Sequence, residues 1–595
     1  MFKIKSNFKM NDDKSLKISS SFNPSIIVFY VSSGISENDG FYQTAKSFEK
    51  IYNLSKKKFN ILFLYPKNMN ELLNDINKKK PSIIFFNGNR TTLSWLNLNK
   101  IKKKNITTVE SFGSEINQKK ALYYDGSSFD YLLTDDPTIN ISNQRVFKIG
   151  RFIQKKIRNY YKSNKTIIGS FGFPDKSKNF EKVIDLAKKN FKEFNVRYHI
   201  PKSSYMDLDG KIYNEISQKI KKKTSNFIIT RDLLSKKDLV KKLSENDINC
   251  FLYTSERGDG SQVSGILEYA IAANRPLSLS NSTMFRHFFY HYPNKVIKSK
   301  NLNQIQNNGV EYFKRFYEEW SDENFIWDFN RIIEKIITKP VIKYHEWYIK
   351  NKTRRLKDLY KYYLKKNEVE FDHEVELNKI YNENYDLYVP NINKNYELNV
   401  FLNSEDINLF KDELVAYKKT VPTIIKEKFY PGLIQHCYMM RAVLFHINKI
   451  KNPNILCIGS YMDPLAIYLR RLGYWVDDCD PNLNYDFDEL LHKPSIVKKK
   501  YDLIFSISVL EHVNDDLNLI RLSYKKLKRK GLSIHTVDFK ENPELIPNTH
   551  IRFYNYNSAL KIKEKYKLPE IKNSPKYDVY YNNTNYSFWG FGLIK

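Results

Sequence analysis

The strongest constraint on the fold is a regular alternation of short apolar runs with longer amphipathic runs. The first apolar runs are strand-length and rich in β-branched and aromatic residues: IIVFYV (26–31), NILFLYP (60–66), SIIFFNG (82–88), ITTVESF (106–112) and YLLTD (131–135). Helix-like runs lie between them, for example over Gly40–Leu54 and Met69–Lys79. Because parallel strands need crossover connections, usually helices, this alternation predicts an α/β fold with parallel sheets.

Two further series of the same kind follow. The strand-like runs of the second series are TIIGSFGF (166–173), VRYHIP (196–201), NFIIT (226–230), INCFLYT (248–254) and RPLSLSN (275–281). A helix is expected over Asn179–Asn190, and a third series begins at Pro453 and runs to the C terminus. Two consecutive doubly wound units predict a cleft at the carboxyl ends of their strands, where ligands bind.

The length of 595 residues is too great for one core and predicts several domains. We predict two Rossmann-like domains, a helical connector and a C-terminal Rossmann-like domain. The connector is expected because the runs after about residue 301 are long and rich in Lys, Tyr, Glu and Trp. The predicted bounds, in that order, are 22–163, 164–340, 341–434 and 435–595.

The formal net charge of +32 raises the question of a nucleic-acid partner. The lysines are spread evenly along the chain, and no recognition helix, zinc finger or RNA-binding signature accompanies them. This distribution indicates no specific nucleic-acid binding. A weaker expectation is attraction to anionic membrane surfaces or to phosphorylated substrates.

The apolar runs and the cysteines of the sequence indicate where in the cell the protein is found. No apolar run approaches the roughly 20 residues of a membrane helix, and the first 20 residues carry charges where a signal peptide has its apolar region. The four cysteines form no close metal-ligand pair: Cys250, Cys437, Cys457 and Cys479. We therefore predict a cytoplasmic protein with reduced cysteines, peripheral at most at the inner face of the membrane.

The segment from Tyr253 to Leu277, YTSERGDGSQVSGILEYAIAANRPL, carries the most chemistry in the first half of the chain. A strand leads into a Gly/Ser turn and then into a helix that contains Glu268. Backbone N–H groups around Ser264 and Gly265 are suited to a diphosphate. A carboxylate on the helix is suited to the ribose hydroxyls, so this pattern predicts a nucleotide-sugar site.

This segment resembles the carboxyl-terminal domain of GT-B-fold glycosyltransferases, especially the retaining enzymes that use nucleotide-sugar donors. Glu268 matches the second glutamate of the E-x7-E pattern of that family, whereas Gly260 stands in place of the first. Lys178, before NFEKVIDLA, matches the basic residue that contacts the donor phosphates, with Lys176 as the alternative. The resemblance covers about 25–337 and implies a sugar donor, a glycan or lipid-linked glycan acceptor and no bound metal.

A second motif, ILCIGSYMDPLAIYLRRLGYWVDDCDP, spans Ile455 to Pro481. With YDLIFSISVLEHVND (501–515) and SYKKLKRKGLSIHTVDF (523–539), it resembles class I S-adenosylmethionine-dependent methyltransferases over about 435–595. The resemblance implies S-adenosylmethionine as cofactor and a late antiparallel edge strand in YSFWGFGLIK. The residues expected to contact the cofactor are Gly459, Ser460, Asp480 and Glu511.

Transfer of a methyl group to a hydroxyl needs a base for the departing proton, and histidine titrates in the useful range. His512 is the first candidate and His550, before RFYN, is the second. His535 is the third, with an ordinary strand position as the alternative.

Together these patterns predict a bifunctional enzyme that adds a sugar to a glycan acceptor and methylates that glycan or a related acceptor, in bacterial surface polysaccharide or glycoconjugate synthesis. One alternative has a single active domain, the other being a degenerate binding module. It is motivated by Gly260 and by the glycine-poor turn at Ser460. A second alternative is a non-enzymatic basic scaffold that binds polyanions.

Overall fold

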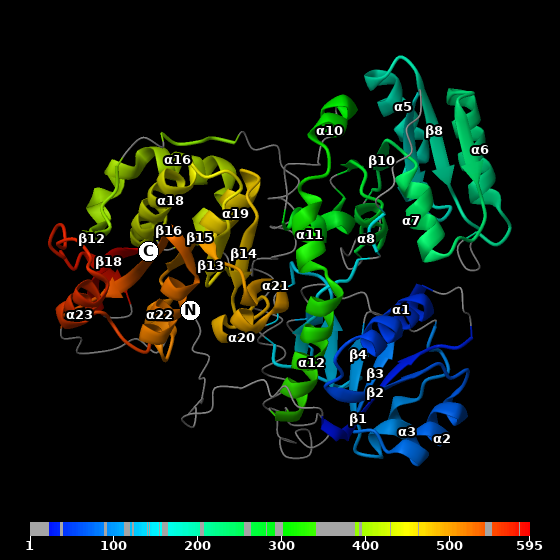
Figure 1. Cartoon of the computed structure of the whole chain (residues 1–595), viewed down its shortest axis with the longest axis horizontal. Coiled ribbons are helices and arrows are strands. Elements are labelled where there is room, and N and C mark those ends of the chain that lie inside the picture. Colours follow the sequence, from blue (N-terminus) through cyan, green and yellow to red (C-terminus); the bar gives the residue numbers. More distant parts are fainter. Residues whose placement is uncertain are drawn as a thin grey trace. The chain divides into compact units, whose positions relative to one another are not determined.

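The computed structural model describes most of the chain and divides it into two compact units (Figure 1). Unit 1 comprises 1–114, 126–131 and 326–344, and unit 2 comprises 115–125, 132–325 and 345–595. The described residues are 23–595 except 36–39, 89–91, 112–119, 122–123, 140, 142, 154, 158–164, 203–206, 255–262, 281, 292–300, 339, 341–386, 392–394, 429, 462, 542–549 and 582–583.

The first sheet has the strand order β2-β1-β3-β4-β5-β6. Its strands and helices are β1 (Asn23–Ser32), α1 (Gly40–Leu54), β2 (Phe59–Leu64), α2 (Met69–Lys79), β3 (Ile83–Asn87), α3 (Leu98–Lys102), β4 (Thr107–Ser111), β5 (Tyr131–Thr134) and β6 (Val146–Lys148). β1 pairs in parallel with β2 and β3, and β3 pairs in parallel with β4. The predicted parallel series is confirmed here, and α1 and α2 have the predicted bounds.

Helix α2 illustrates why these segments are helical. Its buried residues Met69, Leu72 and Ile76 are three and four positions apart, so they share one face. The Asn68 side chain accepts hydrogen bonds from two backbone N–H groups of the first turn. Lys80 then ends the helix in the left-handed conformation, with φ of 51°.

Part of a long helix belongs to the core of unit 1. Helix α12 (Asp322–Thr338) carries Phe329, whose ring centroid lies 4.6 Å from that of Phe85 on β3 and 4.7 Å from that of Phe48 on α1. Aromatic pairs at such distances stabilise a core beyond the area they bury. The sequence therefore returns to the first sheet after the whole second series.

The second sheet has the order β11-β10-β7-β8-β9, and its neighbouring strands run parallel. Its elements are β7 (Thr166–Phe171), η1 (Lys176–Lys178), α5 (Phe180–Asn190), β8 (Phe194–His199), α6 (Lys211–Lys223), β9 (Phe227–Thr230), α7 (Lys236–Ser244), β10 (Ile248–Phe251), α8 (Ile266–Ala272) and β11 (Leu277–Leu279). After it come η2 (Thr283–Phe285), α9 (Arg286–Phe289), α10 (Leu302–Asn308) and α11 (Phe313–Glu319). The five predicted strands of this series are all present.

The third sheet has the order β12-β18-β16-β15-β13-β14, and β17 pairs with β18. Its strands are β12 (Asn399–Leu402), β13 (Ile455–Ile458), β14 (Val476–Cys479), β15 (Tyr501–Ile507), β16 (Leu527–Phe539), β17 (Val579–Tyr581) and β18 (Thr584–Ile594). β18 runs antiparallel to β16, as predicted. Its predicted edge position is wrong, because β12 pairs with its other side.

The helices of this part surround the third sheet. They are η3 (Ser404–Phe410), α16 (Lys411–Thr420), α17 (Pro422–Glu427), η4 (Tyr430–Gly432), α18 (Leu433–Ile447), α19 (Pro464–Arg471), α20 (Phe487–His492), α21 (Pro494–Val497), η5 (Leu510–His512), α22 (Asp516–Lys526) and α23 (Tyr556–Tyr566).

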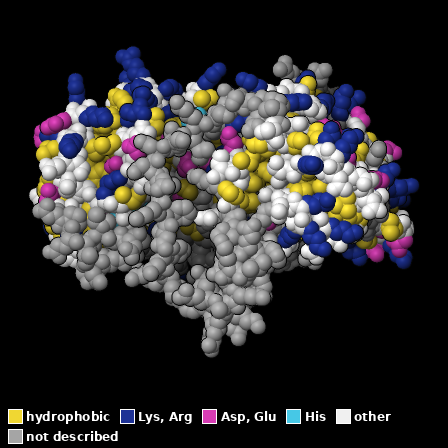
Figure 2. Space-filling view, turned by 90° about the horizontal axis from the view of Figure 1, so that it is seen from below, with side chains coloured by type: hydrophobic (Ala, Val, Ile, Leu, Met, Phe, Trp, Pro, Cys, Tyr) yellow, Lys and Arg dark blue, Asp and Glu magenta, His cyan; other side chains and the backbone are white. Residues whose placement is uncertain are grey.

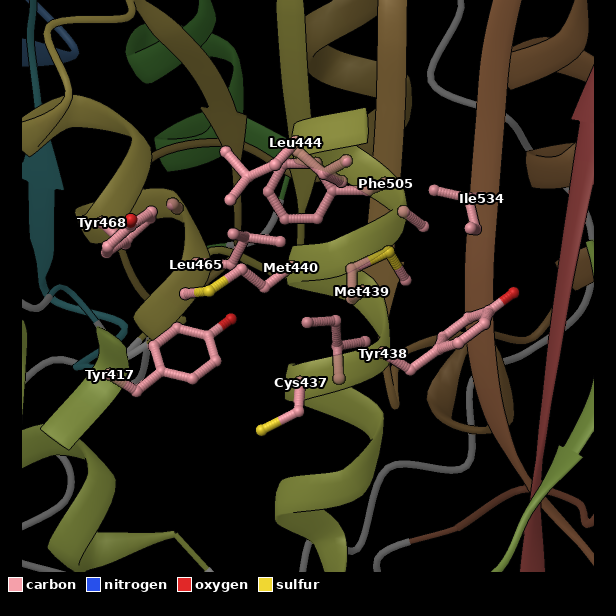
Figure 3. Packing of buried hydrophobic residues seen from close by; sticks show 14 of the residues in the cluster. Tyr417, Cys437, Tyr438, Met439, Met440, Leu444, Leu465, Tyr468, Phe505 and Ile534 are labelled. Carbon is pink, nitrogen blue, oxygen red and sulfur yellow. The ribbon is translucent and has the colours of Figure 1, made fainter. Parts of the chain in front are cut away.

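Helix α18 is the centre of the largest apolar core (Figure 3). Figure 3 shows Tyr438 on one side of this helix, with Tyr417 of α16 and Tyr468 of α19 on the other. A Cβ built at Gly590 of β18 would come within 2.7 Å of the Tyr438 ring, so glycine leaves the space that this ring fills. The third sheet and its core thus draw residues from 399–434, which the sequence assigned to a connector. Tyr388 and Tyr396, earlier in that predicted connector, pack against the same core, whereas 341–386 and 392–394 lie outside the described residues.

Charged and apolar side chains are mixed on the described surface (Figure 2). Figure 2 shows Lys and Arg side chains scattered over the described surface of one face, interspersed with apolar and acidic ones. Among the described residues, no helix is both long enough and apolar enough to span a membrane. All four cysteines are buried, as predicted for core residues.

Candidate functional site

Glu268 lies in the first turn of α8, close to a buried arginine. One carboxylate oxygen, Oε1, forms an ion pair with Nη1 of Arg151. The other, Oε2, is buried and has no hydrogen-bond partner among the residues that the structure describes. Glu268 therefore has one oxygen held in place and one available to a donor group.

Arg151 joins this helix to the end of β5. Its Nη2 lies 2.7 Å from Asp135 Oδ2, and its Nε donates to the Asp135 backbone oxygen over 3.2 Å. The arginine side chain is only 7% exposed, so the two carboxylates hold it as a fixed cation. Although burial opposes the charge, Asp135 and Glu268 together raise the pKa of Arg151.

Two charged groups near α8 are electrostatically unusual. Burial raises the pKa of Glu268 above its ordinary value, and the charge of Arg151 offsets this only in part. Burial also lowers the pKa of Lys236, at the start of α7, to about 8, although the charge of Glu268 opposes that shift. Perturbed groups of this kind are enriched at binding sites.

Ser264 and Gly265 lead directly into α8. The Ser264 N–H donates to the Met284 backbone oxygen over 2.9 Å, and its side chain is buried. Gly265 is exposed, and a Cβ built there would lie 3.8 Å from Glu268 Oε2. The structure thus brings Gly265 next to the oxygen of Glu268 that has no donor. Helix α8 has seven residues and contains Glu268, as predicted.

Lys178 ends the short helix η1 after β7. Its Nζ lies 3.7 Å from the centroid of the Tyr253 ring, which follows β10. A cation over an aromatic face is held by the ring quadrupole. The alternative, Lys176, forms an exposed ion pair with Glu215 over 2.8 Å, so Lys178 is the better placed of the two.

The Gly/Ser turn itself, 255–262, lies outside the described residues, and so does Gly260, which stands in place of the first glutamate of the family pattern. The Gly/Ser loop after β1 is described in part: the Gly34 N–H donates to the Pro66 backbone oxygen over 3.1 Å. A Cβ at Gly34 would overlap the Tyr65 backbone. This glycine is therefore needed for close backbone approach.

In the third sheet, Gly459 follows β13 in the left-handed conformation, with φ of 77°. Its N–H donates to the Cys479 backbone oxygen over 2.8 Å, and a Cβ built on it would overlap Cγ2 of Val509. Ser460, the next residue, is buried, and its hydroxyl has no partner among the described residues. One glycine is thus sufficient for this turn and is required by it.

Replacing Gly459 with alanine is expected to destabilise the third sheet. The left-handed backbone costs about 1–2 kcal/mol for an alanine, and the overlap with Val509 costs about 1–3 kcal/mol more. In a Val509→Ala background the overlap is gone, so Gly459→Ala should then cost only the backbone contribution. Urea unfolding followed by tryptophan fluorescence measures the difference. Equal costs in the two backgrounds would contradict this account of the turn.

Three aspartates lie at or just after β14, and each of them makes different contacts. Asp477 pairs with Lys499 over 2.6 Å, and Asp478 pairs with Arg470 over 2.7 Å and accepts from Tyr290. The Asp480 carboxylate instead accepts backbone N–H groups, from Tyr461 over 3.1 Å and from Asn482 over 2.8 Å.

The Asp480 contacts connect the ends of two strands, because Tyr461 lies in the turn after β13. Burial raises the pKa of Asp480, and the two backbone bonds partly offset this. The aspartate therefore stabilises the turn, and each of its oxygens can accept a further hydrogen bond.

Glu511, His512 and His550 are brought together although 37 residues separate the first two from the third. The ring centroids of the two histidines are 4.7 Å apart. His550 Nε2 lies 2.8 Å from Oδ2 of Asp538, near the end of β16. Burial and the nearby charge of Asp538 raise the pKa of Glu511 well above its ordinary value.

His535 is an ordinary strand residue. It is fully buried in β16, with its two ring nitrogens 2.7 Å from Ser506 Oγ and 2.8 Å from Ser533 Oγ. Burial lowers its pKa to about 3. The strand alternative for this residue is therefore the correct one.

The sequence did not identify Arg151, Lys236 and Asp538 as candidate site residues. The signal for Asp538 was its place at the end of the strand-like run SIHTVDF, where ligand-facing residues collect. Asp135, which Arg151 contacts, likewise lies at the end of a strand-like run, YLLTD. Arg151 and Lys236 themselves lie in lysine-rich stretches, where nothing in the sequence distinguishes them.

No protein-family model matches this sequence, and no curated protein is similar to it. Solved structures that match part of the chain include the HepE protein of Anabaena in complex with UDP-glucose, at 11% identity and a TM-score of 0.37. That likeness covers 53% of this chain and 100% of the Anabaena chain.

Two more structures have comparable values. A glycosyltransferase from Rickettsia africae has 12% identity and a TM-score of 0.39, over 54% of this chain and 100% of the other. Sucrose-phosphate synthase from Thermosynechococcus elongatus has 8% identity and a TM-score of 0.39, over 53% and 99%. Such values assign no activity to this chain.

Proposed function

We propose that the chain is a glycosyltransferase that binds a nucleotide-sugar at Glu268 and transfers the sugar to a glycan or lipid-linked glycan. Glu268 accepts the ribose hydroxyls through Oε2, next to the open side of Gly265. Lys178 and the backbone from Gly265 hold the diphosphate; the Ser264 N–H, expected from the sequence to contribute, already donates to the Met284 backbone oxygen.

The observation that carries this proposal is the half-satisfied carboxylate of Glu268. A buried carboxylate oxygen without a donor is costly, and such groups are retained where a ligand supplies the hydrogen bond. The bond between Arg151 and Oε1 fixes the orientation of the carboxylate before the ligand arrives. Preorganised acceptors of this kind bind with little further loss of side-chain entropy.

The proposed chemistry is transfer through an oxocarbenium-like transition state. The bond between the anomeric carbon and the diphosphate oxygen breaks, the acceptor hydroxyl forms the new bond to that carbon, and its proton passes to the departing diphosphate. Negative charge develops on the departing diphosphate, so nearby cations lower the barrier. Lys178 and Lys236 are the described basic side chains assigned to this role, and the proposal needs no metal ion in this step.

The test of donor binding is calorimetric titration of the purified full chain with a panel of nucleoside diphosphates. We expect one member of the panel to bind with a stoichiometry of one per chain. Absence of binding by every nucleoside diphosphate at millimolar concentration would refute the proposed site. A basic scaffold would instead bind polyanions of any kind, with a strong dependence on salt.

A second function is proposed for the third sheet: binding of S-adenosylmethionine and methylation of the glycan or a related acceptor. Two features support it. Gly459 makes the left-handed turn that ends β13, and the Asp480 carboxylate lies at the end of the neighbouring parallel strand. In this proposal Ser460 and Glu511 line the site, and His512 or His550 takes the acceptor proton.

Replacing Asp480 with asparagine is expected to weaken S-adenosylmethionine binding by about 10- to 100-fold, since a hydrogen bond to a charged group contributes about 1.5–3 kcal/mol. Asp488→Asn, on the exposed side of α20, is the matched control and should leave binding unchanged. Fluorescence titration measures both. If the unmodified chain does not bind the cofactor at millimolar concentration, the third sheet has another role.

The setting proposed for these reactions is bacterial surface polysaccharide or glycoconjugate synthesis, at the inner face of the membrane. The net charge of +32 supports attraction to anionic lipid surfaces. Co-sedimentation with anionic and neutral vesicles at two salt concentrations tests this. Equal sedimentation with both kinds of vesicle would contradict it.

A further inference from the structure

Three side chains that commonly bind metal ions converge at one edge of the third sheet. Glu511 and His512 belong to η5, directly after β15, and His550 precedes α23. One potential ligand atom from each residue lies within 4.8 Å of those of the other two. This edge holds the carboxyl ends of β15 and β16, where α/β proteins bind ligands.

The carboxylate of Glu511 is only partly satisfied. Its side chain is fully buried, and Oε1 accepts a long hydrogen bond of 3.4 Å from the Asp538 N–H. Oε2 has no hydrogen-bond partner among the residues that the structure describes. Removing a carboxylate from water is costly unless a positive group compensates, so this oxygen favours a cation beside it.

His550 is oriented by a second carboxylate. Asp538 Oδ2 contacts His550 Nε2 over 2.8 Å, and the histidine ring stacks on Phe553 with centroids 5.2 Å apart. In metal sites a carboxylate on one imidazole nitrogen typically fixes the ring while the other nitrogen binds the ion. The Asp538–His550 pair has that arrangement.

We propose that Glu511, His512 and His550 bind a divalent transition-metal ion of the Zn²⁺ type, with Asp538 as a positioning residue. Two imidazoles and one carboxylate suit Zn²⁺ and its neighbours in the first transition row. Mg²⁺ and Ca²⁺ prefer oxygen ligands throughout, so they are poor occupants. Three protein ligands leave at least one coordination position for water or substrate, as in catalytic sites.

The proposed ion would lie near the turn of Gly459, because Val509, two residues before Glu511, contacts that turn. An ion there supplies Lewis-acid activation of a bound hydroxyl or water. As ligands the two histidines could not also take the acceptor proton, so metal binding and the proton-acceptor role proposed above are alternatives for these side chains. The inference does not depend on sugar transfer or on S-adenosylmethionine binding, and its test measures metal binding alone.

The test uses the full chain after removal of metals by chelation and dialysis. Titration with Co²⁺ is followed by visible absorption, and Zn²⁺ is then added as competitor. We expect one Co²⁺ per chain, a spectrum typical of four or five ligands with nitrogen among them, and full displacement by Zn²⁺. Mg²⁺ at the same concentration should displace none.

Variants identify the ligands. His512→Ala, at an exposed position that should not disturb folding, is expected to abolish the Co²⁺ spectrum. Asp538→Asn should weaken binding by about 10- to 100-fold while the spectrum remains, as expected for a group outside the coordination sphere. His492→Ala, an exposed histidine on α20 outside the cluster, is the matched control and should behave like the unmodified chain.

Circular dichroism checks that each variant is folded. If Co²⁺ does not bind, or binds equally well to His512→Ala and to the unmodified chain, the proposal is overturned. If His550→Ala does not fold, the result with His512→Ala decides, since that side chain is on the surface.

Discussion

Replacing Glu268 with glutamine is expected to weaken nucleotide-sugar binding by about 10- to 100-fold. Glutamine has nearly the same shape and keeps an oxygen that can accept from Arg151, so the fold should persist. It loses the charge, and a hydrogen bond between a hydroxyl and a charged acceptor contributes about 1.5–3 kcal/mol. Calorimetric titration with the nucleotide-sugar whose diphosphate binds best gives the affinities.

Glu193→Gln is the matched control for this experiment. Glu193 lies in the same α/β series, its side chain is 73% exposed, and its ion pair with Lys165 is long at 3.4 Å. We expect it to leave the affinity unchanged. Equal affinities for Glu268→Gln and Glu193→Gln would show that Glu268 does not contact the donor.

The same carboxylate predicts a pH dependence. Burial raises the pKa of Glu268, so the charged form that accepts the ribose hydroxyls is lost at a higher pH than for an ordinary glutamate. Donor affinity should therefore fall as the pH decreases through this raised pKa. Glu268→Gln, which cannot titrate, should lack that decrease.

Replacing Asp136 with alanine should lower the free energy of unfolding by about 3–5 kcal/mol, the usual cost of breaking a buried ion pair. Asp136 Oδ2 lies 2.6 Å from Arg286 Nε, and the two side chains are 3% and 1% exposed. The variant leaves the Arg286 guanidinium buried without its carboxylate. Urea unfolding followed by circular dichroism measures the loss.

The control for Asp136 is an exposed pair in the same unit. Asp209 and Lys211 lie 2.8 Å apart with side chains 57% and 82% exposed. Because solvent screens such pairs, Asp209→Ala should have almost no effect on stability. Similar losses for Asp136→Ala and Asp209→Ala would contradict the structural importance given to the buried pair.

Lowering the pH should remove part of the folding stability that Asp136 contributes. Burial alone would raise the pKa of Asp136, but Arg286 and two hydrogen bonds to Thr138 outweigh it and hold the pKa below its ordinary value of 3.8. A carboxyl group whose pKa is lowered on folding stabilises the folded state above its unfolded pKa. This contribution is lost only as the pH falls below about 4, and Asp136→Ala should lack that part of the pH dependence.

Much of the fold follows from local pattern. The strands of the first two series are short β-branched or aromatic runs, and α1 and α2 begin and end where the sequence predicts. These elements are predictable because the spacing of apolar residues within each one indicates a helix or a strand. The residues at its ends, such as Asn68 before α2, indicate where it begins or stops. The antiparallel direction of β18 was likewise predicted.

What could not be predicted depends on distant partners. β12 has only four residues, and it pairs with β18, whose residues follow almost 200 positions later. No local period distinguishes these four residues, three of them apolar, in a strand from the same residues in a linker. The sequence of helix α16 likewise predicts a helix exposed to solvent, although Ala416 and Tyr417 are buried in the core.

The candidate sites show the same division. The residues named from the sequence, among them Glu268, Asp480 and His550, lie next to recognisable turns or strand ends. Their partners were not recognisable, since Arg151 contacts Glu268 from 117 positions away. Pairings of this kind are set by the tertiary fold.

The most direct test of the central claim is release of nucleoside diphosphate from nucleotide-sugars by the purified full chain. We expect one nucleotide-sugar to be cleaved with multiple turnovers, faster when a glycan acceptor is present, and at least about 10 times more slowly by Glu268→Gln. If no nucleotide-sugar in a broad panel is cleaved, or if Glu268→Gln cleaves it as fast as the unmodified chain, the assignment of a sugar-transfer site at Glu268 is wrong.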